Sequence, residues 1–512
     1  MKFLVFPALN DPWLDNGLEV LHKAIKDIKT QHKGVLGKLL LEPDRLAFEI
    51  LEEEYLLDLL DKLFENWFIG RLHYWSEKRG EKKLVLKQFV TFNRQPQSQF
   101  PKLFIETKRR ELIRNALTPP SKDGELCPVC GAGSKQWEKL TLSVHPMATK
   151  IKSLSGVRTR ITDKGLKGLS EHFRICPRCY LRGALAWLDN GLIYRTFIGR
   201  RLSAVLVPAP LNLDLSRLSE LKDRFRRQLR LQDGRSNVKV IIRRGKQVVE
   251  ESPPAENSIL LAFLERLLHD ILAEVKGSFL DVRRSISEGW QVFVIPIGPL
   301  KNVVAKELIL DDPTIRLLKD CVEVKLRPYQ DIIASMWLVD ERTNRFITDE
   351  VDELREKLSK AVLENDFSSF ASLFVPRPRR NLAYRWETEE SMEKFVEHWR
   401  RNYMDEERLG VIKKVGRALA QISAERKSPT LLYALERARS PKDLLEVLSQ
   451  ASHRLIGLEA DKLQYISLEG LEKLTDILSE INLSEFREVK NTLMIFAGLE
   501  WARRIRRNSA QQ

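Results

Sequence analysis

The sequence predicts an α+β protein: a mixed α/β N-terminal body with an inserted zinc-ribbon-like four-cysteine site, followed by a C-terminal antiparallel helical bundle. Strand and helix patterns alternate over most of the chain, two Cys-x-x-Cys pairs interrupt them, and helical stripes alone fill the end. The chain has 512 residues, 43% of them hydrophobic, which allows several domains with large cores. We expect four regions: 1–126 (N-terminal α/β), 127–180 (zinc knuckles with a basic insertion), 181–385 (basic mixed α/β) and 386–512 (helical bundle).

The hexamer WLDNGL occurs twice, at 13–18 and at 187–192. The first copy opens an apolar helical spacing, where Asp15 or Asn16 is placed to cap the helix by accepting backbone N–H groups. The second copy ends a short helix predicted at about 180–188. Because the match stops at the hexamer, we interpret it as shared capping chemistry and not as an internal repeat.

Further elements follow from local patterns. Apolar runs rich in β-branched and aromatic residues predict strands, an Arg-Gly between such runs predicts a hairpin, and proline-rich stretches predict linkers. We expect strands at 2–9, 84–92 and 290–297, a hairpin at 237–250, a helix at 259–275, and linkers at 207–213 and 375–381.

The last quarter has the pattern of a helical bundle. Apolar residues recur at helical spacing, as in the stripe from Val411 to Ile422. Ser428-Pro429 and Ser440-Pro441 place a cap residue before a proline at the first helical position. Short connections between such helices predict antiparallel neighbours, and we expect four or five helices.

No membrane-spanning or export segment is predicted. The sequence has no run of about 18 apolar residues and no signal-peptide pattern at its start. We therefore expect a cytoplasmic protein without a membrane partner. In that compartment disulfides are disfavoured, and paired cysteines indicate metal binding.

Four of the five cysteines form two pairs, Cys127-Pro-Val-Cys130 and Cys176-Pro-Arg-Cys179. A Cys-x-x-Cys turn aims two thiolates at one point, and two such turns complete a tetrahedral Zn²⁺ site. Four thiolates leave no open position for water, so we predict a structural zinc; buried or redox-active thiols are the alternative. The 45 residues between the pairs imply an insertion. His145 and His172 within it are less favoured ligands than the cysteines.

Basic charge is concentrated in the body of the protein. The net charge is +15, and residues 386–512 hold 21 Lys and Arg against 21 Asp and Glu, so the excess lies in 1–385. This segregation favours a polyanionic partner, because Lys and Arg displace counterions from phosphates; solubility alone is the other interpretation. The candidate nucleic-acid-binding residues are Arg158, Arg160, Lys164, Arg195, Arg200, Arg201, Arg224, Arg226, Arg227, Arg230, Arg243, Arg244, Lys246, Arg377, Arg379 and Arg380.

Common enzyme motifs are absent from the sequence. It has no Walker A loop, no Rossmann glycine fingerprint, no Gly-x-Ser-x-Gly and no His-Glu-x-x-His. The lone His269-Asp270 pair and the acidic run at 349–353 resemble helix-surface groups more than metal ligands. We therefore predict a binding protein that is not an enzyme. One alternative is a zinc-dependent nuclease or nucleic-acid-modifying enzyme with a helical regulatory tail, and another is a transcription or translation factor with a zinc ribbon.

The combination of these features resembles the large subunits of type I CRISPR effector complexes (Cascade), in the lineage named for its CXXC–CXXC pattern. Cys127, Cys130, Cys176 and Cys179 match its zinc knuckles. The opening NDPWLDNGL at 10–18 is similar to that lineage's strand leading to an aspartate and a glycine at the head of a helix. The resemblance spans the chain in architecture, rests on these two motifs, and implies subtype I-A or I-B.

The resemblance implies a subunit that caps the crRNA-bearing backbone filament, recognises the protospacer-adjacent motif in double-stranded DNA, aids strand separation and R-loop formation, and docks the helicase-nuclease. The C-terminal bundle is similar to the small subunit and would lie beside the displaced strand. An internal start at Met404 would release a free small subunit. Asn16, Asn93 and Asn237 are candidate base readers, because we expect them in loops.

Overall fold

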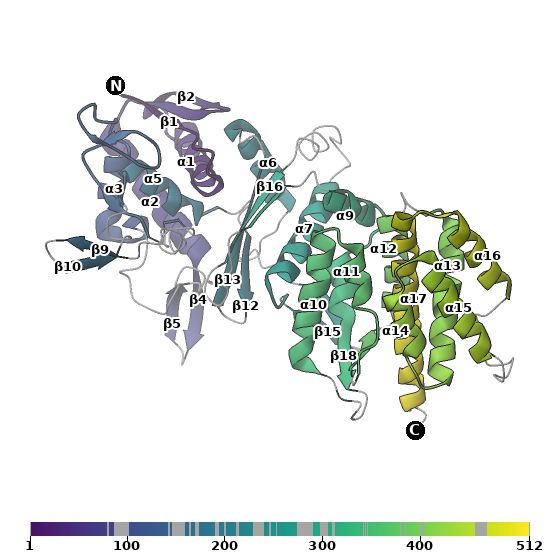
Figure 1. Cartoon of the computed structure of the whole chain (residues 1–512). Coiled ribbons are helices and arrows are strands. Elements are labelled where there is room, and N and C mark those ends of the chain that lie inside the picture. Colours follow the sequence, from purple (N-terminus) through teal and green to yellow (C-terminus); the bar gives the residue numbers. More distant parts are fainter. Residues whose placement is uncertain are drawn as a thin grey trace. The chain divides into compact units, whose positions relative to one another are not determined.

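The computed structural model confirms the α+β class, with many helices and small antiparallel sheets (Figure 1). The structure describes residues 2–78, 81–86, 102–141, 144–145, 159–162, 165–168, 174–189, 194–198, 201–210, 214–228, 240–244, 247–251, 253–273, 290–296, 306–309, 313–340, 343, 345, 347–378, 380–384, 386–400, 404–455 and 468–510. Two compact units are present, unit 1 (Met1–Val238 and Leu280–Asp311) and unit 2 (Lys239–Phe279 and Asp312–Gln512). The four regions expected from the sequence stay a prediction.

Unit 1 combines two antiparallel sheets, in the orders β1-β3-β2 and β12-β13-β16-β17, with short hairpins and helices. Its helices are α1 (Pro12–Gln31), α2 (Glu53–Leu72), α3 (Glu106–Ala116), α5 (Pro177–Ala186) and α6 (Leu215–Gln228). Its strands are β1 (Lys2–Pro7), β2 (Leu36–Glu42), β3 (Arg45–Ile50), β4 (His73–Lys78), β5 (Glu81–Leu86), β6 (Glu125–Leu126), β7 (Gly133–Ser134), β8 (Glu138–Lys139), β9 (Thr159–Thr162), β10 (Gly165–Gly168), β11 (Arg174–Ile175), β12 (Tyr194–Ile198), β13 (Arg201–Pro210), β16 (Trp290–Pro296) and β17 (Lys306–Ile309).

Helix α1 is the centre of the core of unit 1, and most of its side chains are buried. Asp11 is its N-cap: Oδ1 accepts two backbone N–H groups of the first turn, at 2.9 and 2.8 Å. The prediction that Asp15 or Asn16 caps the helix is therefore wrong. Pro12, at the first helical position, has no N–H to cap and allows the helix to begin earlier. Asp15 instead reaches back and accepts the N–H groups of Leu9 and Asp11.

The first copy of WLDNGL and the described part of the second, residues 187–189, contact each other in this core. The second copy follows the end of α5, as predicted. The ring centroids of Trp13 and Trp187 are 4.8 Å apart in an edge contact, and the indole N–H of Trp13 donates to two backbone carbonyls at 2.8 and 3.1 Å. A Cβ at Gly17 would clash with the carbonyl oxygen of Arg182, so α1 and α5 touch through their backbones.

A buried ion-pair triad joins α1 and the second hexamer to α6. Nζ of Lys222 lies 3.0 Å from carboxylate oxygens of Glu19, which directly follows the first copy, and of Asp189, which belongs to the second. All three residues are at most 1% exposed. Because removing one partner would leave a buried charge unpaired, breaking the triad costs about 3–5 kcal/mol. The first copy thus serves packing, and its interpretation as a cap is wrong; residues 190–192 of the second copy, where a helix-ending cap was expected, lie outside the described residues.

Strand β13 runs into the segment 207–213, which the sequence pattern assigned to a linker. Its pairing with β12 ends at Leu206, whereas its pairing with β16 continues through Pro210. Pro208 and Pro210 therefore lie where one side of β13 is no longer paired to β12. A proline is tolerated at such a position because its missing N–H breaks no ladder there.

Unit 2 confirms the predicted hairpin near 237–250 and the helix near 259–275, and adds a helical bundle. Its strands are β14 (Val240–Arg244), β15 (Gln247–Glu251), β18 (Met336–Asp340) and β19 (Arg380–Tyr384). Its helices are α7 (Glu256–Ala273), α9 (Pro313–Glu323), α10 (Thr348–Leu363), α11 (Phe367–Ser372), α12 (Trp386–Arg400), α13 (Glu406–Glu425), α14 (Thr430–Arg437), α15 (Pro441–Leu455), α16 (Leu468–Glu480) and α17 (Leu483–Ala510), with shorter helical turns at Pro328–Ile332 and Ile333–Ser335. Six helices lie in the described part of 386–512, against four or five expected.

Whether two neighbouring helices of the bundle run antiparallel or parallel depends on how the chain connects them. Arg417 of α13 forms an ion pair with Glu389 of α12 at 2.6 Å, and Lys413 pairs with Glu393, so these two neighbours run antiparallel, as predicted. Helices α13 and α17 run in the same direction, because Gly416 meets the backbone near Leu493 and Glu425 lies 3.9 Å from Arg504. A short connection forces neighbours to be antiparallel, but three helices separate α13 from α17.

Close helix packing generates a first prediction. A Cβ at Gly498 of α17 would clash with the carbonyl oxygen of Phe374, whereas nothing lies within 4 Å of a Cβ at Gly410 of α13. We expect Gly498→Ala to lower the free energy of unfolding by about 1–3 kcal/mol. The matched control Gly410→Ala should raise it by up to about 1 kcal/mol, because alanine favours a helix. Urea unfolding of both variants measures this, and equal effects would contradict the close approach at Gly498.

Glu265 of α7 gives unit 2 a pH-dependent element. The residue is 2% exposed, and its carboxyl group accepts the backbone N–H groups of Tyr329 at 2.7 Å and Gln330 at 3.1 Å. Burial raises the pKa of Glu265 from 4.5 to about 8. The folded state therefore holds this proton more tightly than the unfolded state does.

We expect the free energy of unfolding of unit 2 to fall as the pH rises from about 4.5 to about 8, because only the unfolded state releases the proton freely in this range. Glu265→Gln cannot titrate and should flatten that slope. Urea unfolding at a series of pH values measures both proteins. An identical slope in the variant would show that Glu265 is not its source.

Candidate metal centre

The first cysteine pair lies in a tight turn between β6 and β7. The N–H of Cys127 donates to the carbonyl of Ala132 at 2.9 Å, and the N–H of Gly131 donates to the carbonyl of Cys127 at 2.8 Å. Gly131 has a φ of +67°, in the left-handed region that favours glycine. This turn brings the sulfurs of Cys127 and Cys130 to one point, as the sequence predicts for a knuckle.

The second pair lies at the start of α5 and not in another turn of this kind. Cys176 is the N-cap residue, Pro177 occupies the first helical position, and Cys179 lies in the first turn. Strand β11, paired with β8, leads directly into Cys176. The two pairs are therefore held differently: each has a proline after its first cysteine, but only after Cys176 does the chain continue as a helix. The positive end of the helix dipole favours thiolates at this place.

The four sulfurs converge in a compact cluster that could hold a metal ion. The Sγ atoms of Cys127, Cys130, Cys176 and Cys179 all lie within 4.8 Å of one another. Sγ of Cys130 is 3.6 Å from Sγ of Cys176, and the N–H of Cys176 donates to Sγ of Cys127 at 3.4 Å. Three of the cysteines are at most 2% exposed, and Cys130 is half-buried. The cluster is thus largely shielded from water.

Shared hydrogen bonds separate the pKa values of these thiols. Thiol hydrogen bonds from Cys130, Cys176 and Cys179 lower the pKa of Cys127 below its usual range. The hydrogen bond with Cys127 acts to raise the pKa of Cys130. The hydrogen bonds with Cys176 and Cys179 outweigh this effect and lower the pKa to about 7. The pKa values of Cys176 and Cys179 are raised by their bonds to Cys127 and by burial. A divalent cation would favour the thiolate at all four, so binding would release protons.

Two arginines of α5 lie over the ring of Phe6, and no sequence pattern predicted either contact. Cζ of Arg178 lies 4.5 Å and Cζ of Arg182 lies 5.6 Å from the ring centroid of Phe6. Nη1 of Arg178 donates to the carbonyl of Val5 at 3.0 Å. Burial lowers the pKa of Arg178, and the nearby cysteines act against that shift. The place of Arg178 inside Cys-Pro-Arg-Cys is a signal for a role at the cluster, but its inward direction depends on how α5 packs.

Of the two histidines considered as ligands, His145 has partners other than the sulfur cluster. Nε2 of His145 lies 3.1 Å from Oδ2 of Asp11, the N-cap residue of α1. Its ring also makes an edge contact with Trp13. His145 therefore belongs to the head of α1. His172 lies outside the described residues.

Two of the predicted nucleic-acid-binding residues have described side chains, and both form ion pairs. Arg377 pairs with Glu436 through two bonds, at 2.6 and 2.9 Å, and Nε of Arg380 lies 2.8 Å from Oε2 of Glu350. The described backbone, without side chains, includes Arg160, Arg195, Arg201, Arg224, Arg226, Arg227, Arg243 and Arg244. Arg158, Lys164, Arg200, Arg230, Lys246 and Arg379 lie outside the described residues. Nucleic-acid contact stays a prediction for all of these positions.

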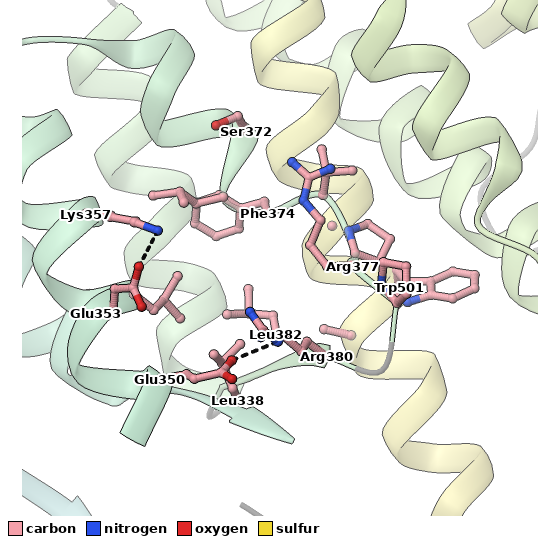
Figure 2. A pocket seen from close by; sticks show the side chains of 17 residues that line it. Leu338, Glu350, Glu353, Lys357, Ser372, Phe374, Arg377, Arg380, Leu382 and Trp501 are labelled. Carbon is pink, nitrogen blue, oxygen red and sulfur yellow. Dashed lines mark ion pairs between the residues drawn. The ribbon is translucent and has the colours of Figure 1, made fainter. Parts of the chain in front are cut away.

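Arg377 and Arg380 also line a pocket of about 630 Å³ in unit 2 (Figure 2). Its apolar lining includes Phe374, Leu382 and Trp501, and it lies among α10, β19, α17 and the turn after α11. Figure 2 shows Lys357 directed at Glu353 and Arg380 directed at Glu350. Each cation of the described lining is paired with a carboxylate. The pocket therefore presents no unpaired positive charge to a phosphate, and we assign it no ligand.

Local contacts account for other groups considered from the sequence. Nε2 of His269 lies 3.1 Å from Nη2 of Arg327. The acidic run at 349–353 lies in the first turns of α10, as predicted. Asn16, expected in a loop, is fully buried in α1, where its amide donates to the carbonyl of Pro12. It is not accessible to a base. Asn93 and Asn237 lie outside the described residues.

A scan of protein-family models and a search of curated proteins find no match to this chain. In the part of the chain that the structure describes, no helix has both the length and the apolar character needed to cross a membrane. Conclusions about function therefore rest on the residues and their geometry.

The cluster generates a prediction about metal content. We expect the purified wild-type chain to hold about one metal ion, and Cys127→Ser to lose it, because a serine hydroxyl replaces a thiolate ligand. The variant should also lower the free energy of unfolding of unit 1 by about 4 kcal/mol or more. Elemental analysis and urea unfolding measure the two effects. Cys321→Ser is the matched control, since Cys321 is buried in α9 outside the cluster and should keep the metal. Equal metal content in the two variants would contradict the assignment.

Proposed function

We propose that this chain is the non-catalytic large subunit of a crRNA-guided type I CRISPR surveillance complex, with a structural zinc ion at the four cysteines. One observation carries the proposal: the two motifs behind the resemblance belong to a single packed unit. Helix α5 supplies Cys176 and Cys179 and packs against α1, whose head carries NDPWLDNGL at 10–18. Two motifs that occurred by chance, far apart in the chain, would have no reason to share a core.

Zinc fits this donor set. Four thiolates are soft ligands, which favour Zn²⁺ over Mg²⁺ or Ca²⁺. Zn–S bonds of about 2.3 Å place tetrahedral sulfurs about 3.8 Å apart. The 3.6 Å between Cys130 and Cys176 supports such a site, and the upper bound of 4.8 Å leaves only a small contraction. The ion would join the turn between β6 and β7 to the start of α5.

In this role, unit 1 would act as a rigid platform for DNA. Its basic residues would bind phosphates without regard to sequence, a few side chains would read the protospacer-adjacent motif, and the guide RNA would read the remainder. The electrically neutral bundle would lie along the filament beside the displaced strand. The partners are the crRNA-bearing backbone subunits, the small subunit, the target duplex and the helicase-nuclease.

The contacts between α12 and α13 argue against an independent small subunit that starts at Met404. Such a product would begin just before α13 and lack α12. It would lose the ion pairs of Arg417 with Glu389 and Glu393, in which all three side chains are at most 20% exposed. The bundle would then expose a face that α12 covers in the whole chain.

Co-purification tests the proposal directly. A tagged chain isolated from its own cells should bring crRNA of uniform length, which sequencing of the bound RNA measures. The variant Cys321→Ser should keep this RNA, whereas Cys127→Ser should lose it together with the metal. RNA of random length, or none, would count against the proposal. Cleavage of DNA by the purified chain with a divalent cation would favour the zinc-dependent nuclease instead.

A further inference from the structure

Arg178 is a buried cation without a carboxylate partner among the described residues. The residue is 8% exposed, at the second position of α5, between Cys176 and Cys179. Its guanidinium lies over the ring of Phe6, and Nη1 donates to the carbonyl of Val5. Nε and Nη2 are buried and have no hydrogen-bond partner. These contacts stabilise only part of a charge that has been removed from water.

Two other buried arginines in the described part of the chain form ion pairs with acids. Arg109 is 3% exposed and lies 2.6 Å from Asp61. Arg400 is 5% exposed and lies 2.7 Å from Glu488. Arg182, one turn after Arg178, also has buried nitrogens without a hydrogen-bond partner, at Nε and Nη1, but its charge interacts electrostatically with the carboxyl group of Asp15. A buried charge without its own counter-charge is costly, so Arg178, which has no carboxylate partner among the described residues, calls for another anionic group nearby.

The sulfur cluster can supply that anionic group. Cys176 and Cys179 flank Arg178 on the same helical turn, and their sulfurs lie within 4.8 Å of those of Cys127 and Cys130. Four thiolates around a divalent cation carry a net charge of about −2. A doubly negative complex that is largely buried needs compensating positive charge, just as the guanidinium needs negative charge.

We infer that Arg178 is the counter-charge of the metal–thiolate centre. Its guanidinium stabilises the doubly negative complex electrostatically, and the loaded complex supplies the anionic partner that Arg178 otherwise lacks. The inference rests on the proposed metal centre and goes beyond it, because it assigns metal affinity to a residue that is not a ligand. Phe6 and Val5 would then hold the guanidinium in place beside the sulfurs.

The test compares Arg178→Met with the wild type and with Arg178→Lys, using Zn²⁺ alone and a competing chelator. Methionine keeps the apolar contact with Phe6 but not the charge, so the dissociation constant for Zn²⁺ should rise about 10–100-fold. Lysine keeps the charge and should restore most of the affinity. By linkage, hydrogen exchange in α5 should show that Arg178→Met lowers stability more with Zn²⁺ bound than without it.

Arg109→Met is the matched control, because it removes a buried arginine whose partners are carboxylates and should lower stability equally with and without Zn²⁺. Unchanged Zn²⁺ affinity in Arg178→Met, or equal loss of affinity in the methionine and lysine variants, would overturn the inference. If Arg178→Met does not fold, Arg178→Lys and Arg178→Gln replace it, and only the lysine variant should keep tight binding. A wild-type chain that binds no Zn²⁺ would overturn the metal centre itself.

Discussion

Helices α1 and α5 touch through their backbones at Gly17 and Arg182, and the architecture of unit 1 depends on this contact. Any side chain at Gly17 would push α5 away, and α5 carries two of the four cysteines. The edge contact of Trp13 with Trp187 fixes the end of α5 beyond this point, and the buried triad around Lys222 ties both helices to α6. The precision with which four sulfurs meet is therefore set by helix packing as much as by the turn around Cys127.

Local sequence patterns predicted the features that have local causes. The α+β class, the helix after residue 12, the hairpin near 240 and the convergence of four cysteines all followed from spacing and turn chemistry. Features that depend on distant partners did not follow. The strand through Pro208 depends on where β12 stops pairing, and the parallel course of α13 and α17 depends on three intervening helices. The meeting of the two hexamers could not be predicted, because nothing in either copy identifies the other as its neighbour.

A count of basic residues overstates the positive charge that is free to meet a polyanion. Lys222 is buried between two acids, Arg109 is paired with Asp61, and Arg178 and Arg182 point into the core. Arg377 and Arg380 are exposed, but their ion pairs with Glu436 and Glu350 connect this part of the chain to α14 and α10. Charges that the sequence presents as a surface property thus serve partly to hold helices together. Only the basic side chains that remain unpaired and exposed are relevant to DNA binding.

Between the two cysteine pairs, the chain passes through β8 and later through β11, and these two strands pair antiparallel. Whatever length of chain runs from Lys139 to Arg174, its two ends are held side by side. The entropic free-energy cost of closing such a loop grows only logarithmically with loop length, by about 0.6 kcal/mol for each doubling. Val144 and His145, near the start of this excursion, contact Trp13 and Asp11 and are part of the core, so only the stretch after His145 is free to change in length without disturbing the cluster. It is also the place where an engineer could insert a foreign domain or a label.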